Sequence, residues 1–110
     1  MLRFSSPRSA QTRSNWALVV AEVEATVQNL VDCFNAGMLV EFAALHTPEG
    51  LLEECGTTNV YDAPMCFGAP FGVTLESVTD VQVLDDGRVS ADVTVVLGSF
   101  LSRERMFFVQ

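Results

Sequence analysis

Apolar residues recur at alternate positions on both sides of an Asp-Asp-Gly corner at residues 85–87. All of these positions are odd-numbered: Val73, Leu75, Val81 and Val83 before the corner, and Val89, Ala91, Val93, Val95 and Leu97 after it. Such alternation is typical of β-strands with one buried face, because successive side chains point to opposite sides of a sheet. The stretch predicts an antiparallel hairpin that buries one face against the rest of the chain.

The numbering of the apolar positions also indicates the length of the turn. A two-residue loop would place Val83 opposite Ser90 and put the two apolar rows on different faces. A three-residue loop with Gly87 in the left-handed region keeps both rows on one face. We therefore expect the longer loop, in which the facing residues are Val83 with Val89, Val81 with Ala91, and Leu75 with Leu97.

Upstream of the hairpin the apolar spacing changes to three and four residues, which is typical of an amphipathic helix. The positions concerned are Val20, Val23, Val27, Leu30, Val31 and Phe34. They predict one long helix from Trp16, with Ser14 or Asn15 as its N-cap and Gly37 just beyond its end.

Two shorter helices are expected next. One covers residues 38–45 and places four residues on one side: Leu39, Phe42, Ala43 and His46. The other begins where Thr47 serves as N-cap and Pro48 fills the first turn, and it ends at Gly56. Residues 57–72 contain two prolines and two glycines. They predict a binding loop or lid, with no regular element beyond a short strand at 59–62.

Residues 1–14 are rich in Ser and Arg and lack periodicity, so we expect a disordered segment before a single domain at 15–110. The whole chain has a net charge of −8, and residues 14–110 hold all fourteen acidic residues against three arginines. Nucleic-acid binding needs a basic surface and is excluded as a main function. No apolar run reaches the about 20 residues of a membrane-spanning helix, so no membrane association is expected.

The cysteines and the single histidine indicate no metal site. The spacings between Cys33, Cys55 and Cys66 match no zinc or redox motif. We expect three reduced thiols and a cytoplasmic protein. His46 alone cannot form a histidine-based metal site, and no cofactor is implied.

The order of these elements resembles the nuclear transport factor two-like superfamily, which includes SnoaL-like polyketide cyclases and ketosteroid isomerases. The most specific matching segments are Phe34-Asn35-Ala36-Gly37 and the corner from Leu84 to Val89. The resemblance implies an α+β fold of cystatin-like type, in which N-terminal helices pack on a curved antiparallel sheet around an apolar pocket. It also implies a homodimer formed through the other face of the sheet.

The chain departs from that family at its end, where members usually continue into one more strand. The segment "RERMFFVQ" would start a third strand and leave "MFFV" as an unusually apolar sheet edge. We expect dimerisation, strand exchange or a chain cut short as the consequence.

Three functions are compatible with this reading. The first, which we favour, is a domain that binds a small apolar molecule without a catalytic motif. Its expected ligand-binding residues are Val20, Val27, Phe34, Phe42, Phe67, Phe71 and Phe107. The second is a cofactor-free lyase, isomerase or hydrolase of ketosteroid isomerase or polyketide cyclase type, and the third is a dimerising interaction module.

An enzyme would draw on four candidate catalytic residues. Tyr61 and Asp62 could serve as hydrogen-bond donor and base in enolisation or epoxide opening. The alternative, which we favour, is a structural tyrosine and a turn-capping aspartate. His46 could carry protons at the pocket mouth, although a hydrogen bond to the end of its own helix is the simpler expectation.

The fourth candidate is Asp92, which the expected turn places opposite Asp80. Two like charges held together raise the pKa of one carboxyl, as a general acid requires. We favour the alternative of a polar surface on which Arg103 or Arg105 supplies the countercharge.

Overall fold

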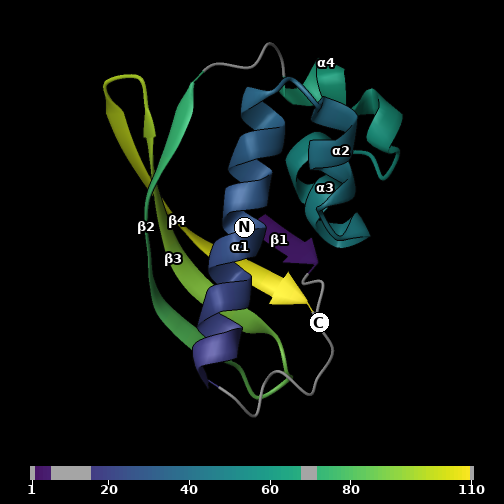
Figure 1. The fold of residues 1–110 in the computed structure, drawn as a ribbon. Coiled ribbons are helices and arrows are strands. Elements are labelled where there is room, and N and C mark those ends of the chain that lie inside the picture. Colours follow the sequence, from purple (N-terminus) through teal and green to yellow (C-terminus); the bar gives the residue numbers. More distant parts are fainter. Residues whose placement is uncertain (1, 6–15, 68–71, 110) are drawn as a thin grey trace.

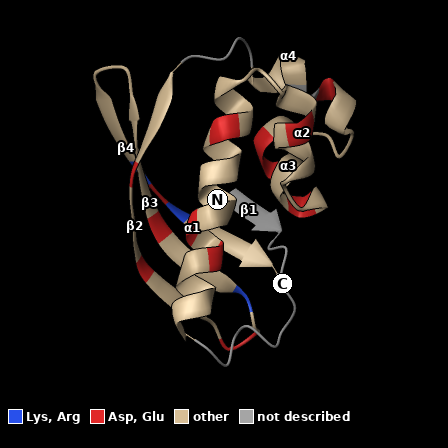
Figure 2. Ribbon diagram, in the orientation of Figure 1, with Lys and Arg blue, Asp and Glu red and all other residues tan. Residues whose placement is uncertain are grey.

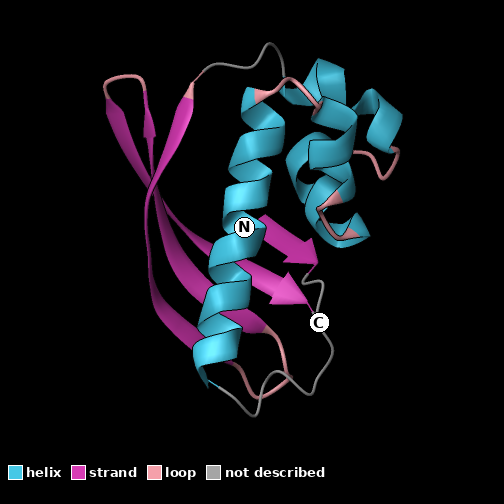
Figure 3. Cartoon of the chain, viewed as in Figure 1, coloured by secondary structure: helices cyan, strands magenta, loops and turns pink. Residues whose placement is uncertain are grey.

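The computed structural model describes residues 2–5, 16–67 and 72–109 and has the expected α+β class. Its helices are α1 (Trp16–Asn35), α2 (Leu39–Ala44), α3 (Pro48–Cys55), the 3-10 helix η2 (Val60–Asp62) and α4 (Ala63–Phe67). Its strands are β1 (Leu2–Ser5), β2 (Val73–Val83), β3 (Val89–Leu97) and β4 (Phe100–Val109). Helix α1 crosses one face of the sheet, and the short helices group beside it (Figures 1 and 3).

The strand order is β1-β4-β3-β2, with β2, β3 and β4 antiparallel and β1 parallel to β4. Strand β1 runs along the edge of β4, where Leu2 pairs with Met106 and Ser5 with Val109. The N-terminal stretch expected to be disordered therefore contributes a strand, while residues 6–14 lie outside the described part of the chain. The apolar edge of β4 is paired with β1 of the same chain. The prediction of strand exchange assumed an unpaired edge, and this edge is not unpaired. A homodimer stays a prediction.

Helix α1 forms the core together with β3 and β4. Its buried side chains pack against the inward face of these two strands. The residues of this core are Val19, Val23, Val27 and Leu30 from the helix and Val89, Ala91, Val93 and Phe108 from the sheet. Burial of each valine, leucine or phenylalanine among them stabilises the fold by about 1.5–3 kcal/mol relative to exposure. The helix ends as expected, because Gly37 has φ 75° and the N–H of Met38 bonds to the carbonyl of Cys33 at 2.9 Å.

The N-cap, the first-turn proline and the terminating glycine expected for the third helix are also confirmed at α3. The side-chain oxygen of Thr47 accepts a hydrogen bond from the N–H of Gly50 at 3.0 Å, and Pro48 is the first helical residue. Gly56 adopts a left-handed conformation with φ 70° and ends the helix.

The prediction of a short strand at 59–62 is wrong, since this segment forms η2 and leads into α4. Side-chain hydrogen bonds give the physical reason. The hydroxyl oxygen of Thr57 accepts from the N–H of Asn59, and the amide oxygen of Asn59 accepts from the N–H of Tyr61, both at 3.0 Å. These local bonds turn the chain back on itself and compete with an extended conformation.

The three-residue turn of the hairpin is confirmed, with Val83 paired to Val89 and Gly87 at φ 87°. The expected partners further along are wrong, because Leu75 pairs with Val95 and not with Leu97. Two irregularities in β2, between Leu75 and Ser77 and between Thr79 and Gln82, each shift the register. Bulges of this kind add a residue to one strand. The alternation of odd and even positions in the sequence does not predict where they occur.

A disulfide joins Cys55 to Cys66, so the expectation of three reduced thiols is wrong. Their Cα atoms lie 5.5 Å apart because α4 folds back onto the end of α3. Cys33 is not part of a disulfide. Disulfides persist mainly in oxidising compartments, so the cytoplasmic location inferred from reduced thiols loses its basis and stays a prediction.

Candidate functional site

A cavity of about 240 Å³ lies between α1, the short helices and the sheet. Four residues of α1 form one wall: Val27, Leu30, Val31 and Phe34. The sheet forms the opposite wall, with Val73, Val95, Leu97, Glu104 and Met106. The helix is held at this distance from the sheet by Asn35, whose side-chain amide donates to the carbonyl of Val73 at 2.7 Å and accepts from its N–H at 2.9 Å.

Aromatic rings close one side of the cavity. Phe42 lies at the centre, with ring centroids 5.4 Å from Phe34, 5.1 Å from His46 and 5.0 Å from Phe67. The rings of His46 and Phe67 are stacked 5.7 Å apart. Pairs of this kind are favourable beyond their buried area, so α2 and α4 present a well-packed aromatic wall.

His46 is the buried polar group of this wall, with 6% of its surface exposed. Its Nδ1 lies 3.0 Å from the carbonyl oxygen of Phe42. A carbonyl can only accept, so Nδ1 carries the proton in this arrangement. Burial lowers the pKa of His46 from its ordinary value, against the smaller opposing effects of hydrogen bonds to Phe42 and Ala43. The helix-end hydrogen bond expected from the sequence is therefore present, and burial favours the neutral imidazole.

Two carboxylates line the cavity from opposite sides, Glu54 on α3 and Glu104 on β4. Both side chains are exposed, so they lie where the cavity meets solvent. Partial burial raises the pKa of Glu54, and the nearby charge of Glu104 raises it further. Sequence reasoning missed both residues, although Glu104 shares the inward face of β4 with Met106 and Phe108.

The residues expected to bind a ligand divide between several places. Four of the seven line the cavity: Val27, Phe34, Phe42 and Phe67. Val20 is half-buried on α1 but is not part of the lining. Phe107 pairs with Ser90 on the opposite face of the sheet, where the guanidinium of Arg88 lies 5.1 Å from its ring centroid. Phe71 lies outside the described residues.

Tyr61 and Asp62 do not line the cavity. Tyr61 is 77% exposed on η2. A carboxylate oxygen of Asp62 accepts a hydrogen bond from the hydroxyl of Thr57 at 3.2 Å, which ties the turn together. The bond of Asp62 fits the turn-capping role favoured for it, the structural role of the Tyr61 side chain stays a prediction, and neither residue lines the cavity.

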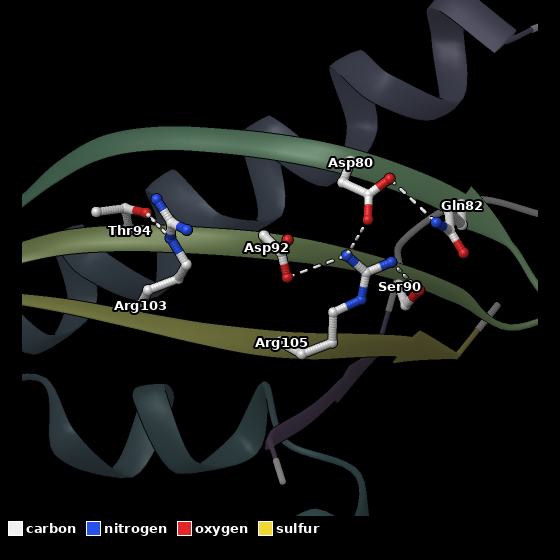
Figure 4. A network of polar contacts seen from close by, with 7 residues as sticks. All are labelled: Asp80, Gln82, Ser90, Asp92, Thr94, Arg103 and Arg105. Carbon is white, nitrogen blue, oxygen red and sulfur yellow. Dashed lines mark hydrogen bonds and ion pairs between the residues drawn. The ribbon is translucent and has the colours of Figure 1, made fainter.

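Asp92 also lies away from the cavity, on the outer face of the sheet (Figure 4). It faces Thr79 rather than Asp80, because of the second irregularity in β2. Nη1 of Arg105 lies 3.0 Å from a carboxylate oxygen of Asp80 and 3.0 Å from one of Asp92. Nη2 of the same guanidinium lies 2.7 Å from the hydroxyl of Ser90. Arg105 thus supplies the countercharge that the polar-surface alternative requires.

The described charges are divided between the two faces of the sheet. The three arginines whose side chains the structure describes are engaged away from the cavity: Arg88 with Asp86 at 2.7 Å, Arg103 with Thr94 at 3.4 Å, and Arg105 with Asp80 and Asp92. Figure 2 shows acidic residues on the short helices, on α1 and on the strands, and the basic residues that it colours lie on β4 and at the hairpin turn. The cavity therefore opens toward acidic groups.

Within residues 2–5, 16–67 and 72–109, no three His, Cys, Asp or Glu side chains are grouped closely enough to hold a metal ion. In the same residues no helix combines the length and apolar character needed to cross a membrane. Comparison with known protein families, curated proteins and solved structures gave no match to this chain. Membership of the nuclear transport factor two-like superfamily therefore stays a prediction.

Proposed function

We propose that this chain binds a small, mainly apolar molecule in the cavity between α1 and the sheet. The observation that carries the proposal is the cavity itself, about 240 Å³ with walls made almost wholly of aliphatic and aromatic side chains. An apolar cavity of about 150 Å³ is enough to hold benzene. A ligand with two fused rings, or an acyl chain of similar volume, suits the larger space.

The rim of the cavity indicates which polar group this ligand carries. Glu54 and Glu104 are the acidic residues of the lining, and ionised carboxylates only accept hydrogen bonds. A carboxylate ligand would add a third negative charge, and none of the arginines with described side chains lines the cavity. A ligand with an ammonium or hydroxyl group would donate to these oxygens, and the ammonium would also gain from charge.

A matched ligand series tests the proposal. We would measure binding of 1-naphthylmethylamine, 1-naphthalenemethanol and 1-naphthoate by isothermal titration calorimetry, together with the shift in melting temperature of the chain. A ligand that binds the folded state raises this temperature by mass action. We expect the amine to bind most tightly, the alcohol less tightly and the acid not at all. If none of the three binds, the proposed function is wrong.

His46 and Glu54 favour a second candidate function, the cofactor-free lyase, isomerase or hydrolase. An imidazole whose burial favours the neutral form and a carboxyl with a raised pKa line the same apolar cavity, and both are groups suited to acid–base catalysis. Tyr61, Asp62 and Asp92 would have no part in it. The test is hydrogen–deuterium exchange at the carbon next to the carbonyl of 1-tetralone, followed by NMR. Exchange no faster than in buffer, with binding intact, would leave binding as the function.

A further inference from the structure

The disulfide lies directly beside the cavity. Cys55 follows Glu54 and Cys66 precedes Phe67, and both Glu54 and Phe67 line the cavity. One covalent bond therefore fixes the separation of two lining elements, the end of α3 and the end of α4.

Apart from the disulfide, helix α4 is held mainly by the packing of one residue, Phe67. It has five residues, far fewer than the about 12–15 at which an isolated helix becomes marginally stable in water. Met65 is 94% exposed, and Pro64 and Cys66 are exposed as well. Phe67 is the α4 residue that packs inward, through the rings of Phe42 and His46. The position of Phe67 in the wall is therefore set by this packing together with the bond at the adjacent Cys66.

We propose that the Cys55–Cys66 disulfide is a redox switch that keeps the cavity closed on its α4 side and weakens ligand binding when it is reduced. This inference rests on the proposed binding function and concerns its regulation. Cys66 is exposed and Cys55 is half-buried, so the sulfur of Cys66 is the accessible point of attack.

The reductant is a dithiol, either a small molecule or a protein of thioredoxin type. One of its thiolates attacks the sulfur of Cys66, the disulfide breaks, and Cys55 leaves as a thiolate that takes up a proton. The second thiol of the reductant then displaces Cys66, which also takes up a proton. Two electrons and two protons have passed to the protein, and the reductant ends as a disulfide.

Reduction removes the disulfide cross-link between α3 and α4 and leaves the main chain through residues 56–62 as their covalent connection. The Phe67 ring then leaves its place against His46 for part of the time, and water enters this side of the cavity. If α4 is docked about a tenth of the time, the apparent affinity falls about tenfold.

The test uses the full chain carrying Cys33→Ser, so that the only remaining thiols are those of the disulfide. Calorimetry with 1-naphthylmethylamine is run on the oxidised chain and after reduction with dithiothreitol, with circular dichroism to check that the fold persists. We expect about tenfold weaker binding after reduction, restored by reoxidation. The variant with Cys55→Ser and Cys66→Ser should bind weakly in both conditions. Equal affinity of the oxidised and reduced chains overturns the proposal.

A second readout needs no ligand. His46 is the single histidine, so its ring-proton NMR resonances are readily assigned. The ring current of the stacked Phe67 changes the chemical shifts of these protons. We expect these resonances to move toward their unstructured values on reduction. If the oxidised chain binds no naphthyl compound, the proposed function fails, and the His46 resonances alone decide whether the disulfide holds the wall. Unchanged resonances would contradict the switch.

Discussion

Single side chains decide what the cavity can accept, and neighbours along one strand face opposite environments. Val95 lines the cavity, whereas Val96 pairs with Thr74 and Leu101 and faces away from it. Glu104 and Met106 face inward on β4, while Phe107 between Met106 and Phe108 lies on the other face with Arg88. The chemistry of the site therefore follows from the register of each strand.

A pair of substitutions tests this directly. Val95→Phe fills part of the cavity and should weaken binding of 1-naphthylmethylamine by about tenfold or more, which corresponds to about 1.4 kcal/mol. Val96→Phe adds the same volume on the opposite face and should leave binding unchanged. The measurement is calorimetry on both variants. Equal affinities would place the ligand elsewhere on the molecule.

The pH dependence of stability reports on His46. Because burial lowers its pKa in the folded chain, the unfolded chain binds more protons between the folded value and 6.5. The stability contribution of the neutral imidazole is complete above pH 6.5 and is lost as the pH falls through the folded pKa. The loss is at most about 1.4 kcal/mol for each pH unit in that window.

We expect the free energy of unfolding in urea to decrease between pH 7.5 and 5.5 in the natural chain, and to decrease less in His46→Gln. The raised pKa of Glu54 acts in the opposite direction, since its contribution is lost as the pH rises above its ordinary value of 4.5. Identical pH slopes for the two chains would show that His46 is not buried in its neutral form.

How far residue positions could be predicted depended on whether the signal was local. The capping residues Thr47 and Gly56 act within one helical turn, so their roles could be predicted from the sequence. The prediction that Phe107 lines the cavity is wrong, because nothing in the sequence sets the register of β4 against β3. Once Ser90 is known to pair with Phe107, the inward position of Glu104 follows.

At the scale of elements, α3 and α4 behave as one unit because the Cys55–Cys66 disulfide joins them. The sequence could not reveal this bond, since three cysteines at spacings of 22 and 11 fit several states. The bulges of β2 could not be predicted from the sequence either, because they also depend on tertiary packing. They depend on how the strand fits its neighbours and the helix above it, and Asp80, with φ 51°, adopts its left-handed conformation only within that sheet.

Removing the disulfide should destabilise the chain by up to about 3 kcal/mol, because the unfolded state loses the constraint of a short loop. Cys55→Ser with Cys66→Ser should show this in urea denaturation, compared with Cys33→Ser as the control. An equal free energy of unfolding in the two variants would mean that α4 is held by its ring contacts alone.

At the scale of the whole molecule, α1 and four short helices lie on one side of a sheet whose two outer strands are β1 and β2. The sequence predicted this α+β arrangement from the change in apolar spacing near residue 73. It did not predict β1, because a strand of four residues without alternation of its own forms only where β4 offers an edge.

Strand β1 should protect the apolar edge of β4 from other chains. Replacing residues 2–5 by a Gly/Ser segment of equal length removes the strand but keeps the chain length. We expect this variant to self-associate, because an uncovered edge is a template for pairing. Sedimentation velocity measures the outcome. A variant with the same sedimentation behaviour as the natural chain would show that β1 does not protect this edge.

The most direct measurement of the proposed binding site is intermolecular NOE spectroscopy on the chain with 1-naphthylmethylamine. We predict NOEs from the naphthyl protons to the methyl groups of Val27, Leu30 and Val95, which face each other across the cavity. NOEs confined to exposed apolar residues such as Leu101 and Met65, with none to these three, would contradict a ligand site between α1 and the sheet.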